Sequence, residues 1–140
     1  MASVFTKIID GDIPGRFVWR DDRCAAFLTI EPLNPGHTLV VPIDEIDHWI
    51  DLPPDLAGHL FEVAHVIGKA LQEGFSPARI GLIIAGMEIP HAHVHVVPIN
   101  RESDLHFGNA DRNARADDLD RAAATIRLVL QGMGHEPPVS

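Results

Sequence analysis

Three histidines occupy alternate positions in the stretch HAHVHVVP, residues 91–98. Because alternate side chains of a β-strand point to the same face, we expect His91, His93 and His95 to lie side by side. The alanine and valines between them would then be buried on the opposite face. A lone histidine on a solvated face is usually an incidental polar residue, but three in register are not, since histidine favours strands less than threonine or valine. The spacing therefore predicts a functional cluster.

A row of imidazoles is suited to chemistry at phosphorus. Imidazole titrates near neutral pH, so neighbouring rings can hold different protonation states at one pH. A neutral ring can attack phosphorus while a protonated neighbour donates to the leaving group. A covalent phosphoramidate on histidine would divide one difficult displacement into two easier ones. A cluster with partial positive charge would also attract phosphate without lysine or arginine.

Metal binding is the alternative chemistry for the same residues. Two histidines separated by one residue on a strand can both bind zinc. At about 3.3 Å per residue, however, the Cα atoms of the outer two histidines would lie about 13 Å apart, too far for one tetrahedral ion to bind all three readily. A pair completed by His37 and a nearby carboxylate could still form a metalloenzyme site. We therefore expect no metal on the three histidines together.

The composition limits the class of protein. The chain has 140 residues, enough for one domain, and a formal net charge of −9 from 11 basic and 20 acidic side chains. This acidity disfavours nucleic acids and anionic membranes as partners. Its single cysteine, Cys24, excludes an internal disulfide, and we expect it to be a buried core residue. The first residues show neither a signal peptide nor a membrane span, so we expect a cytoplasmic protein.

The hydrophobic pattern predicts strands and helices that position these histidines. The expected strands are residues 17–22, 24–30, 37–42, 78–85 and 91–98. The expected helices are residues 4–9, 53–73 and about 117–131. Gly74 would be the residue just after the long helix and Asp117 the N-cap of the last helix. His59 and His65 lie off the apolar stripe of the long helix and are expected to face solvent. The pattern is typical of an α+β fold with an antiparallel sheet.

Several blocks of the sequence together resemble the histidine triad (HIT) family of nucleotide hydrolases and transferases. HAHVHVV fits its signature of three histidines separated by apolar residues, and PGHTLVVP, AGMEIPH and VFTKIIDGDIPGRFVWRDDRCAAFLTIEP are similar to its other blocks. The resemblance implies a HIT-like fold: a five-stranded antiparallel sheet with one long helix, a short N-terminal helix and a C-terminal helix. Residues 1–107 would form the HIT domain and residues 108–140 a C-terminal extension within the same single domain. It also implies a homodimer.

The resemblance implies roles for the histidines. His93 would attack the α-phosphorus, His95 would contact the phosphate and the leaving group, and His91 and His37 would orient the cluster. The substrate would be a purine nucleotide such as AMP or GMP in conjugated form, and no cofactor is implied. The branch stays open between phosphoramidase and dinucleoside polyphosphate hydrolase. A histidine at the third triad position argues against the uridylyltransferase branch.

The resemblance also implies a nucleoside pocket and several departures from the family pattern. The positions that line the base in relatives correspond to Val4, Phe5, Ile8, Phe27, Ile30 and Leu39. Thr29 stands where many relatives hold the ribose with Asp or Asn, and its single hydroxyl cannot provide a two-oxygen grip. Gly86 and Glu88 precede the triad and are assigned to nucleotide binding, with the Glu88 carboxylate expected to face solvent because it would repel an anionic substrate.

Two further expectations concern the ends of the chain. Ser3 and Thr6 replace the CxxC motif with which some bacterial relatives bind a structural zinc, so that zinc should be absent. After the triad, His106 and Phe107 could reach the active site. Beside the hydrolase, a nucleotide-binding protein with little turnover remains an alternative, and a metalloenzyme using two of the triad histidines is a second one.

Overall fold

A computed structural model describes residues 2–136 and 138 of the chain. The strands are β1 (Phe17–Arg20), β2 (Cys24–Leu28), β3 (Thr38–Pro42), β4 (Arg79–Ile83) and β5 (Val94–Ile99). The α-helices are α1 (Val4–Ile9), α2 (Pro54–Phe75) and α3 (Ala116–Gly132), and short 3₁₀ helices cover Trp49–Asp51, Glu102–Leu105 and Phe107–Asn109. The predicted α+β fold is confirmed. Within the described part of the chain, no helix is both long and apolar enough to cross a membrane.

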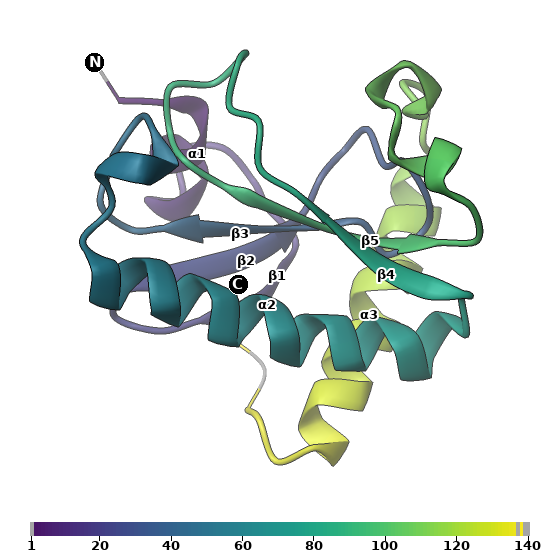
Figure 1. Cartoon of the computed structure of the whole chain (residues 1–140). Helices are drawn as coiled ribbons and strands as arrows, with labels where there is room; N and C mark the ends of the chain where they lie inside the picture. The colour runs from purple at the N-terminus through teal and green to yellow at the C-terminus, as the bar shows by residue number, and fades with distance from the viewer. Residues whose placement is uncertain (1, 137, 139–140) are drawn as a thin grey trace.

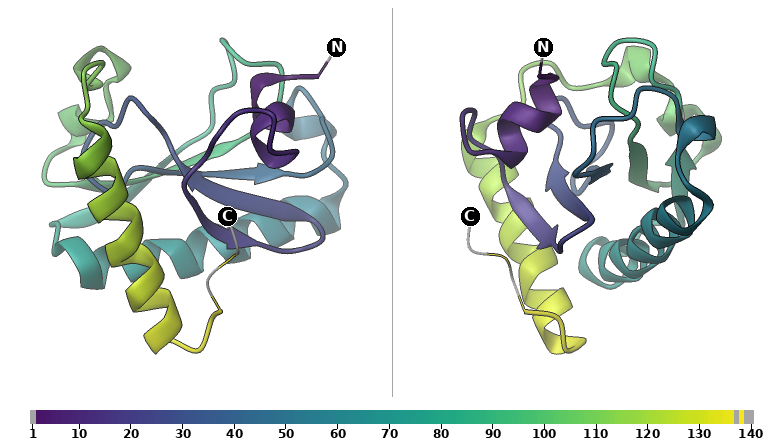
Figure 2. Two further views of the ribbon diagram at one scale, coloured as in Figure 1. Left: turned by 180° about the vertical axis from the view of Figure 1, so that it is seen from behind. Right: turned by 90° about the vertical axis from the view of Figure 1, so that its left-hand side faces the viewer.

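The five strands form one antiparallel sheet in the order β1-β2-β3-β5-β4. The long helix α2 lies along one face of this sheet, and the short helix α1 lies on the other side (Figure 1). Helix α3 crosses behind the sheet and packs against α2 and β1 (Figure 2). Strand β5, which carries His95, is therefore an inner strand that pairs with β3 on one side and with β4 on the other.

Alternation along the strands divides the core between the two faces. Val40, Val94 and Val96 point toward α2 and are buried with its apolar stripe. Leu39 and Phe27 point the other way and pack with Phe5 of α1. Since Leu39 is the cross-strand partner of His95, the His95 ring emerges on the α1 side of the sheet. The valines next to the triad are thus buried against the long helix, as the alternation predicted.

The triad strand begins later than predicted. Strand β5 starts at Val94, so His91 and His93 precede it instead of belonging to it. The backbone there makes one local and one distant hydrogen bond: the His91 N–H donates to the Ile89 carbonyl at 2.8 Å, and the Ala92 N–H donates to the Ile46 carbonyl at 2.7 Å. The straight-strand spacing used against a shared metal therefore does not apply between His91 and His93.

Both long helices end or begin differently from the prediction. Gly74 lies inside α2, and Ser76 instead adopts the left-handed conformation after it, with φ 50°. A Cβ at position 74 would lie 3.0 Å from Thr125 Cγ2 of α3, so the glycine is explained by the close packing of two helices. At the last helix, Arg115 is the N-cap residue and Asp117 lies in the first turn.

Candidate functional site

His93 is held by a hydrogen bond that fixes the position of its proton. Its Nδ1 lies 2.8 Å from the backbone carbonyl of His91. A carbonyl oxygen can only accept, so Nδ1 carries the hydrogen and Nε2 of the neutral ring carries a lone pair. No described residue bonds to Nε2, and no side-chain nitrogen or oxygen among the described residues is both buried and unpartnered, so Nε2 is open to the surface. The ring itself packs edge-on against Phe5, with centroids 4.8 Å apart.

His37 and His95 form a second chain of hydrogen bonds, which places the hydrogen of His95 on Nε2 and not on Nδ1 as in His93. The Leu33 N–H donates to His37 Nδ1 at 3.0 Å, so the neutral His37 ring carries its hydrogen on Nε2. That Nε2 lies 2.9 Å from His95 Nδ1 and donates to it. His95 must then carry its own hydrogen on Nε2, for which no described residue is an acceptor. The His93 and His95 rings lie 4.8 Å apart between centroids, so the site offers an open lone pair next to an open N–H donor.

The cluster is neutral in the free protein, which corrects the prediction of a partly positive one. Burial, followed by repulsion from His95 and His93, lowers the pKa of His37 to about 3. Burial and repulsion from His93 lower the pKa of His95 to about 4. Burial also lowers the pKa of His93, against the opposing effect of its hydrogen bond to the His91 carbonyl. All three rings are therefore uncharged at neutral pH, and the lone pair of His93 is available.

Four of the six residues assigned to the base pocket lie together on the α1 side, and the six differ in exposure. Phe5, Phe27 and Leu39 are buried in the same apolar cluster, with Ile8 partly buried beside them. Val4 is 39% exposed and Ile30 is 69% exposed. An exposed isoleucine and valine are the members of this set that can present apolar surface to a ligand, while the buried ones support them.

The polar residues assigned to nucleotide binding lie at the surface. Thr29 is half-buried, and its hydroxyl oxygen accepts a hydrogen bond from the Glu31 backbone N–H at 3.2 Å. Gly86 is half-buried in the segment before the triad and adopts a φ of +76°, a conformation that L side chains rarely adopt. Glu88 is exposed, as expected for a carboxylate near an anionic substrate.

One contact with the histidines comes from the C-terminal part of the chain. The Phe107 ring lies 5.0 Å from the His95 ring, centroid to centroid. Phe107 is thus placed at the site, whereas its neighbour His106 is exposed and makes no ring contact of this kind within the described residues. The sequence offered both residues without a way to choose, because nothing in RESDLHFGN shows where the chain turns after β5.

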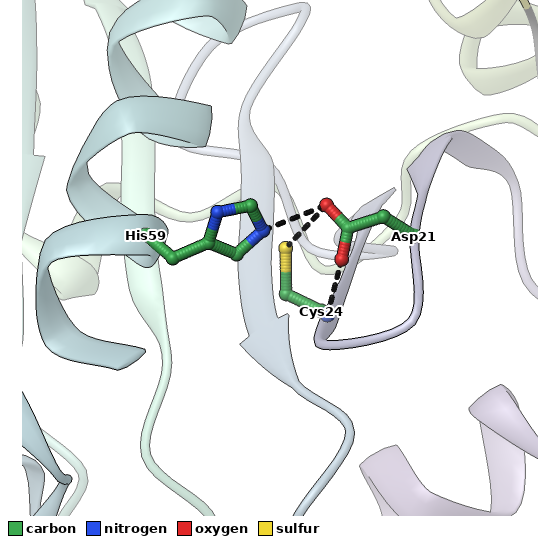
Figure 3. A group of neighbouring side chains, drawn as sticks. All are labelled: Asp21, Cys24 and His59. Atoms are coloured by element: carbon green, nitrogen blue, oxygen red, sulfur yellow. Dashed lines mark hydrogen bonds and ion pairs between the residues drawn. The ribbon is translucent and has the colours of Figure 1, made fainter. Parts of the chain in front are cut away.

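A second polar cluster, which contains one histidine, lies on the α2 side of the sheet, and the sequence did not predict it. His59 Nε2 lies 2.8 Å from Asp21 Oδ2, and the Cys24 thiol donates to the same oxygen at 3.6 Å (Figure 3). His59 is therefore not solvent-facing as predicted, although His65 is exposed as expected. Cys24 is fully buried, which confirms the prediction for it. The signal that was missed is Asp21, which is 38 residues from His59 in sequence.

This second cluster is a closed network of hydrogen bonds. Its ligand-type atoms lie within 4.8 Å of one another, as a metal site would require. Asp21 Oδ2, however, already accepts from Trp19 Nε1 at 2.8 Å as well as from His59 and the thiol, and Oδ1 accepts from the backbone N–H groups of Arg23 and Cys24. Burial and the charge of Asp21 raise the pKa of the Cys24 thiol, which keeps the thiol protonated. The group stabilises the β1–β2 hairpin against α2.

Comparison with known proteins shows the family. The model of the HIT domain matches residues 10–102, and the chain belongs to the HIT family. Protein hit of Bacillus subtilis is 34% identical over 100 residues, which cover 68% of this chain and 69% of that protein. The asymmetrical bis(5'-nucleosyl)-tetraphosphatase of Schizosaccharomyces pombe is 31% identical over 104 residues, which cover 68% of this chain and 57% of that protein. Members of this family bind or hydrolyse nucleotides.

A solved structure of a zinc-bound histidine triad family protein from Mycobacterium smegmatis has the same fold. Its TM-score is 0.80 at 27% identity, and the match covers 96% of both chains. Zinc in proteins is bound by thiolates, imidazoles and carboxylates. The family resemblance puts a zinc-binding CxxC motif of some bacterial relatives at Ser3 and Thr6, whose neutral hydroxyls already make hydrogen bonds to His91 and Glu45 in this chain. These residues do not fit a zinc ion.

Proposed function

We propose that this protein is a nucleotidyl hydrolase that forms a covalent intermediate on His93. The substrate would be a purine nucleoside phosphoramidate or a dinucleoside polyphosphate, cleaved at the α-phosphate. The observation that carries the proposal is the open, unprotonated Nε2 of His93, fixed by the bond from Nδ1 to the His91 carbonyl at 2.8 Å. Neutral imidazole with a defined lone pair is the form that attacks phosphorus.

In the first step, His93 Nε2 forms a bond to the α-phosphorus while the bond to the leaving group breaks. The leaving group departs with the bonding electron pair and takes a proton from solvent. Positive charge develops on the His93 ring, and the His91 carbonyl, which accepts the Nδ1–H, stabilises that charge. In the second step, water attacks phosphorus, its proton goes to solvent, and His93 leaves with its lone pair restored.

His95 and His37 would serve the phosphoryl oxygens. The hydrogen on His95 Nε2 points to the open side of the cluster, because Nδ1 is occupied by His37 at 2.9 Å. A donor fixed in this way stabilises the charge that develops on a phosphoryl oxygen without having to reorient during the reaction. When an anionic substrate binds, its charge raises the pKa of the histidines beside it, so the site gains positive character only with substrate present.

The base would bind against the apolar surface of Val4, Ile8 and Ile30, over the buried Phe27 and Leu39. Such a slot, with few polar groups, accommodates a purine ring. Ile30 is 69% exposed, so its side chain is accessible to a ligand. AMP and GMP moieties both fit this description.

The protein would act as a homodimer. Strand β4 is an edge of the sheet, and beside it an apolar groove is lined by Trp49, Phe61, Leu82 and Ile84, with His93 also in its lining. These four apolar side chains are between 43% and 62% exposed. An edge strand next to exposed apolar residues is a surface that a second copy of this chain would cover. Light scattering should give twice the monomer mass, and Leu82→Glu should give the monomer.

The direct test of the proposed reaction is to trap the intermediate. The protein is mixed with adenosine 5'-phosphoramidate or a diadenosine polyphosphate, quenched in denaturant, and measured by intact-mass spectrometry. We expect one added AMP group, located on His93 by peptide mapping and missing in His93→Ala. Normal turnover by His93→Ala would contradict the mechanism. Tight nucleotide binding by calorimetry with no hydrolysis of either substrate would instead favour a binding protein.

A further inference from the structure

A group of polar contacts joins the start of helix α1 to the segment after β3. The Ser3 hydroxyl oxygen accepts a hydrogen bond from the Thr6 backbone N–H at 3.1 Å, which caps the helix. The Glu45 carboxylate accepts from the Ser3 backbone N–H at 2.6 Å and from the Thr6 hydroxyl at 2.7 Å. One exposed carboxylate thus fixes both residues of the first turn in place.

This group continues into His91, which is fully buried. His91 Nε2 lies 2.8 Å from the Pro42 carbonyl and must carry the hydrogen, because that oxygen can only accept. Nδ1 of the neutral ring is then an acceptor, and the Ser3 hydroxyl donates to it at 2.7 Å. Ser3 is therefore used twice: its oxygen accepts from Thr6 and its hydrogen goes to His91.

The orientation of His91 determines the environment of His93. The ring is held at both nitrogens, and the following peptide is held by the Ala92 N–H, which donates to the Ile46 carbonyl at 2.7 Å. The carbonyl of that peptide is the acceptor for His93 Nδ1–H at 2.8 Å. Hydrogen bonds therefore join Glu45 to the Ser3 backbone, the Ser3 hydroxyl to the His91 ring, and the His91 backbone carbonyl to the proton on His93.

We propose that Ser3, held by Thr6 and Glu45, is a positioning residue that fixes His91 and thereby keeps the proton of His93 on Nδ1. The proposal rests on the proposed function, in which the opposite nitrogen, Nε2, attacks phosphorus. The clamp is made of hydroxyls and a carboxylate, so no metal ion is needed to hold the start of α1 against His91. Ser3 itself is not expected to touch the substrate.

The experiment must separate this role from simple helix capping. Ser3→Gly removes the hydroxyl but leaves a residue that is accepted at an N-cap, at a cost of only a few tenths of a kcal/mol. Ser3→Thr keeps a hydroxyl at the same place and is the matched control. Glu45→Ala is a third variant whose side chain is exposed, so it removes the support for Ser3 without opening the core.

Two quantities are measured on the full chain with ¹⁵N-labelled histidine. Long-range ¹H–¹⁵N correlation spectra report which nitrogen of His93 carries the proton, and steady-state kinetics with adenosine 5'-phosphoramidate report kcat and KM separately. For Ser3→Gly we expect mixed protonation of His93, a kcat lower by about tenfold and a nearly unchanged KM, as is usual when a group supporting a reactive residue is lost. Ser3→Thr should restore both, and Glu45→Ala should change both in the same direction by less.

The proposal is overturned if His93 keeps its proton on Nδ1 alone in both Ser3→Gly and Glu45→Ala, whatever happens to kcat. It is also overturned if a chelator changes the wild-type spectrum, because a metal ion would then hold the segment. The spectra need no turnover. A wild-type protein that hydrolyses nothing would therefore contradict the proposed function while the spectra still decide the role of Ser3.

Discussion

The two faces of the sheet each carry a hydrogen-bonded cluster that includes histidine, and the clusters differ in how their hydrogen bonds end. On the α2 side, His59, the Cys24 thiol and the Trp19 indole all donate to one carboxylate, that of Asp21. On the α1 side, the hydrogen bonds of the histidines run toward the surface and stop at Nε2 of His93 and Nε2 of His95. Neither of these nitrogens has a partner among the described residues.

This difference in how the hydrogen bonds end indicates which buried histidines are available for chemistry. A carboxylate that collects every nearby donor leaves nothing for a ligand, and the cluster contributes only to stability. A series that begins at a backbone N–H or carbonyl and ends on an open nitrogen fixes one tautomer and presents it to a substrate. Burial alone does not separate the two clusters, because each of them contains a fully buried residue.

The strongest test of this comparison removes one histidine from each cluster. His93→Ala should lower kcat/KM on the order of 10³-fold or more, because no other side chain can replace the nucleophile. His59→Gln should leave kcat/KM within about twofold, since it lies outside the site, and should lower stability by about 1 kcal/mol for the lost hydrogen bond. Equal losses of activity in the two variants would remove the distinction between the faces.

A smaller effect is expected from breaking the series behind His95. His37→Ala removes the donor to His95 Nδ1, so His95 can place its proton on either nitrogen, and kcat should fall by about 10- to 100-fold. His37→Gln has an amide N–H that can donate to the same nitrogen and should recover part of the rate. Steady-state kinetics of the two variants, with wild type as reference, measure this, and an unchanged kcat in His37→Ala would contradict it.

The two clusters should lose stability in different ranges of pH. The pKa of His37 is about 3 and that of His95 about 4 in the folded protein, against about 6.5 unfolded. The unfolded chain therefore binds more protons below pH 6.5. The stability that these rings retain above that pH falls as the pH drops from 6.5 toward the folded pKa values, by about 2 kcal/mol for each ring between pH 6.5 and 5.

The stability that depends on Asp21 is lost over a lower range of pH. Burial raises its pKa, but hydrogen bonds from Trp19, the backbone of Arg23 and Cys24, and His59 outweigh it and lower the pKa to about 2. Its contribution is present above pH 3.8 and is lost as the pH falls toward 2. Denaturant unfolding at several pH values measures this. His37→Gln should reduce the pH dependence of the free energy of unfolding in the upper range, and Asp21→Asn should reduce it in the lower range. A slope that neither variant changes would contradict the assignment.

The smallest effect on activity is expected from loss of the contact between Phe107 and the His95 ring. Phe107→Ala removes the ring that packs 5.0 Å from His95, and kcat/KM should fall by about 3- to 10-fold, the usual worth of such a contact. Leu128→Ala, on the exposed side of α3, is the matched control and should have no effect on activity. If Phe107→Ala behaves like Leu128→Ala, the C-terminal segment takes no part in the site.

The sequence predicted the elements well, because their signals are local. The helix over residues 4–9 and the burial of the valines beside the triad follow from periodicity, and HAHVHVV with its companion blocks identified the family. The division of the chain after residue 107, the homodimer and the individual roles of the pocket residues stay predictions. Other features of the structure depend on contacts between residues distant in sequence, which no local pattern shows.

Two long-range hydrogen bonds and the burial of the histidines explain the features that could not be predicted from the sequence. Strand β5 starts at Val94 because Ala92 bonds to Ile46, which is distant in sequence. His59 of α2 is hydrogen-bonded because Asp21, in the turn between β1 and β2, lies next to it in the folded protein. His37, His93 and His95 are neutral because burial lowers the pKa of each ring, and burial depends on the packed fold. The approximate place of the site was predictable, but its charge and its proton positions were not.

The most direct measurement of the central claim is the position of the protons in the wild-type triad. Long-range ¹H–¹⁵N spectra of histidine-labelled protein at neutral pH resolve which ring nitrogen is protonated. We expect His93 with its proton on Nδ1 and His95 with its proton on Nε2, both neutral. A protonated Nε2 on His93, or a charged ring at either position, would contradict the account.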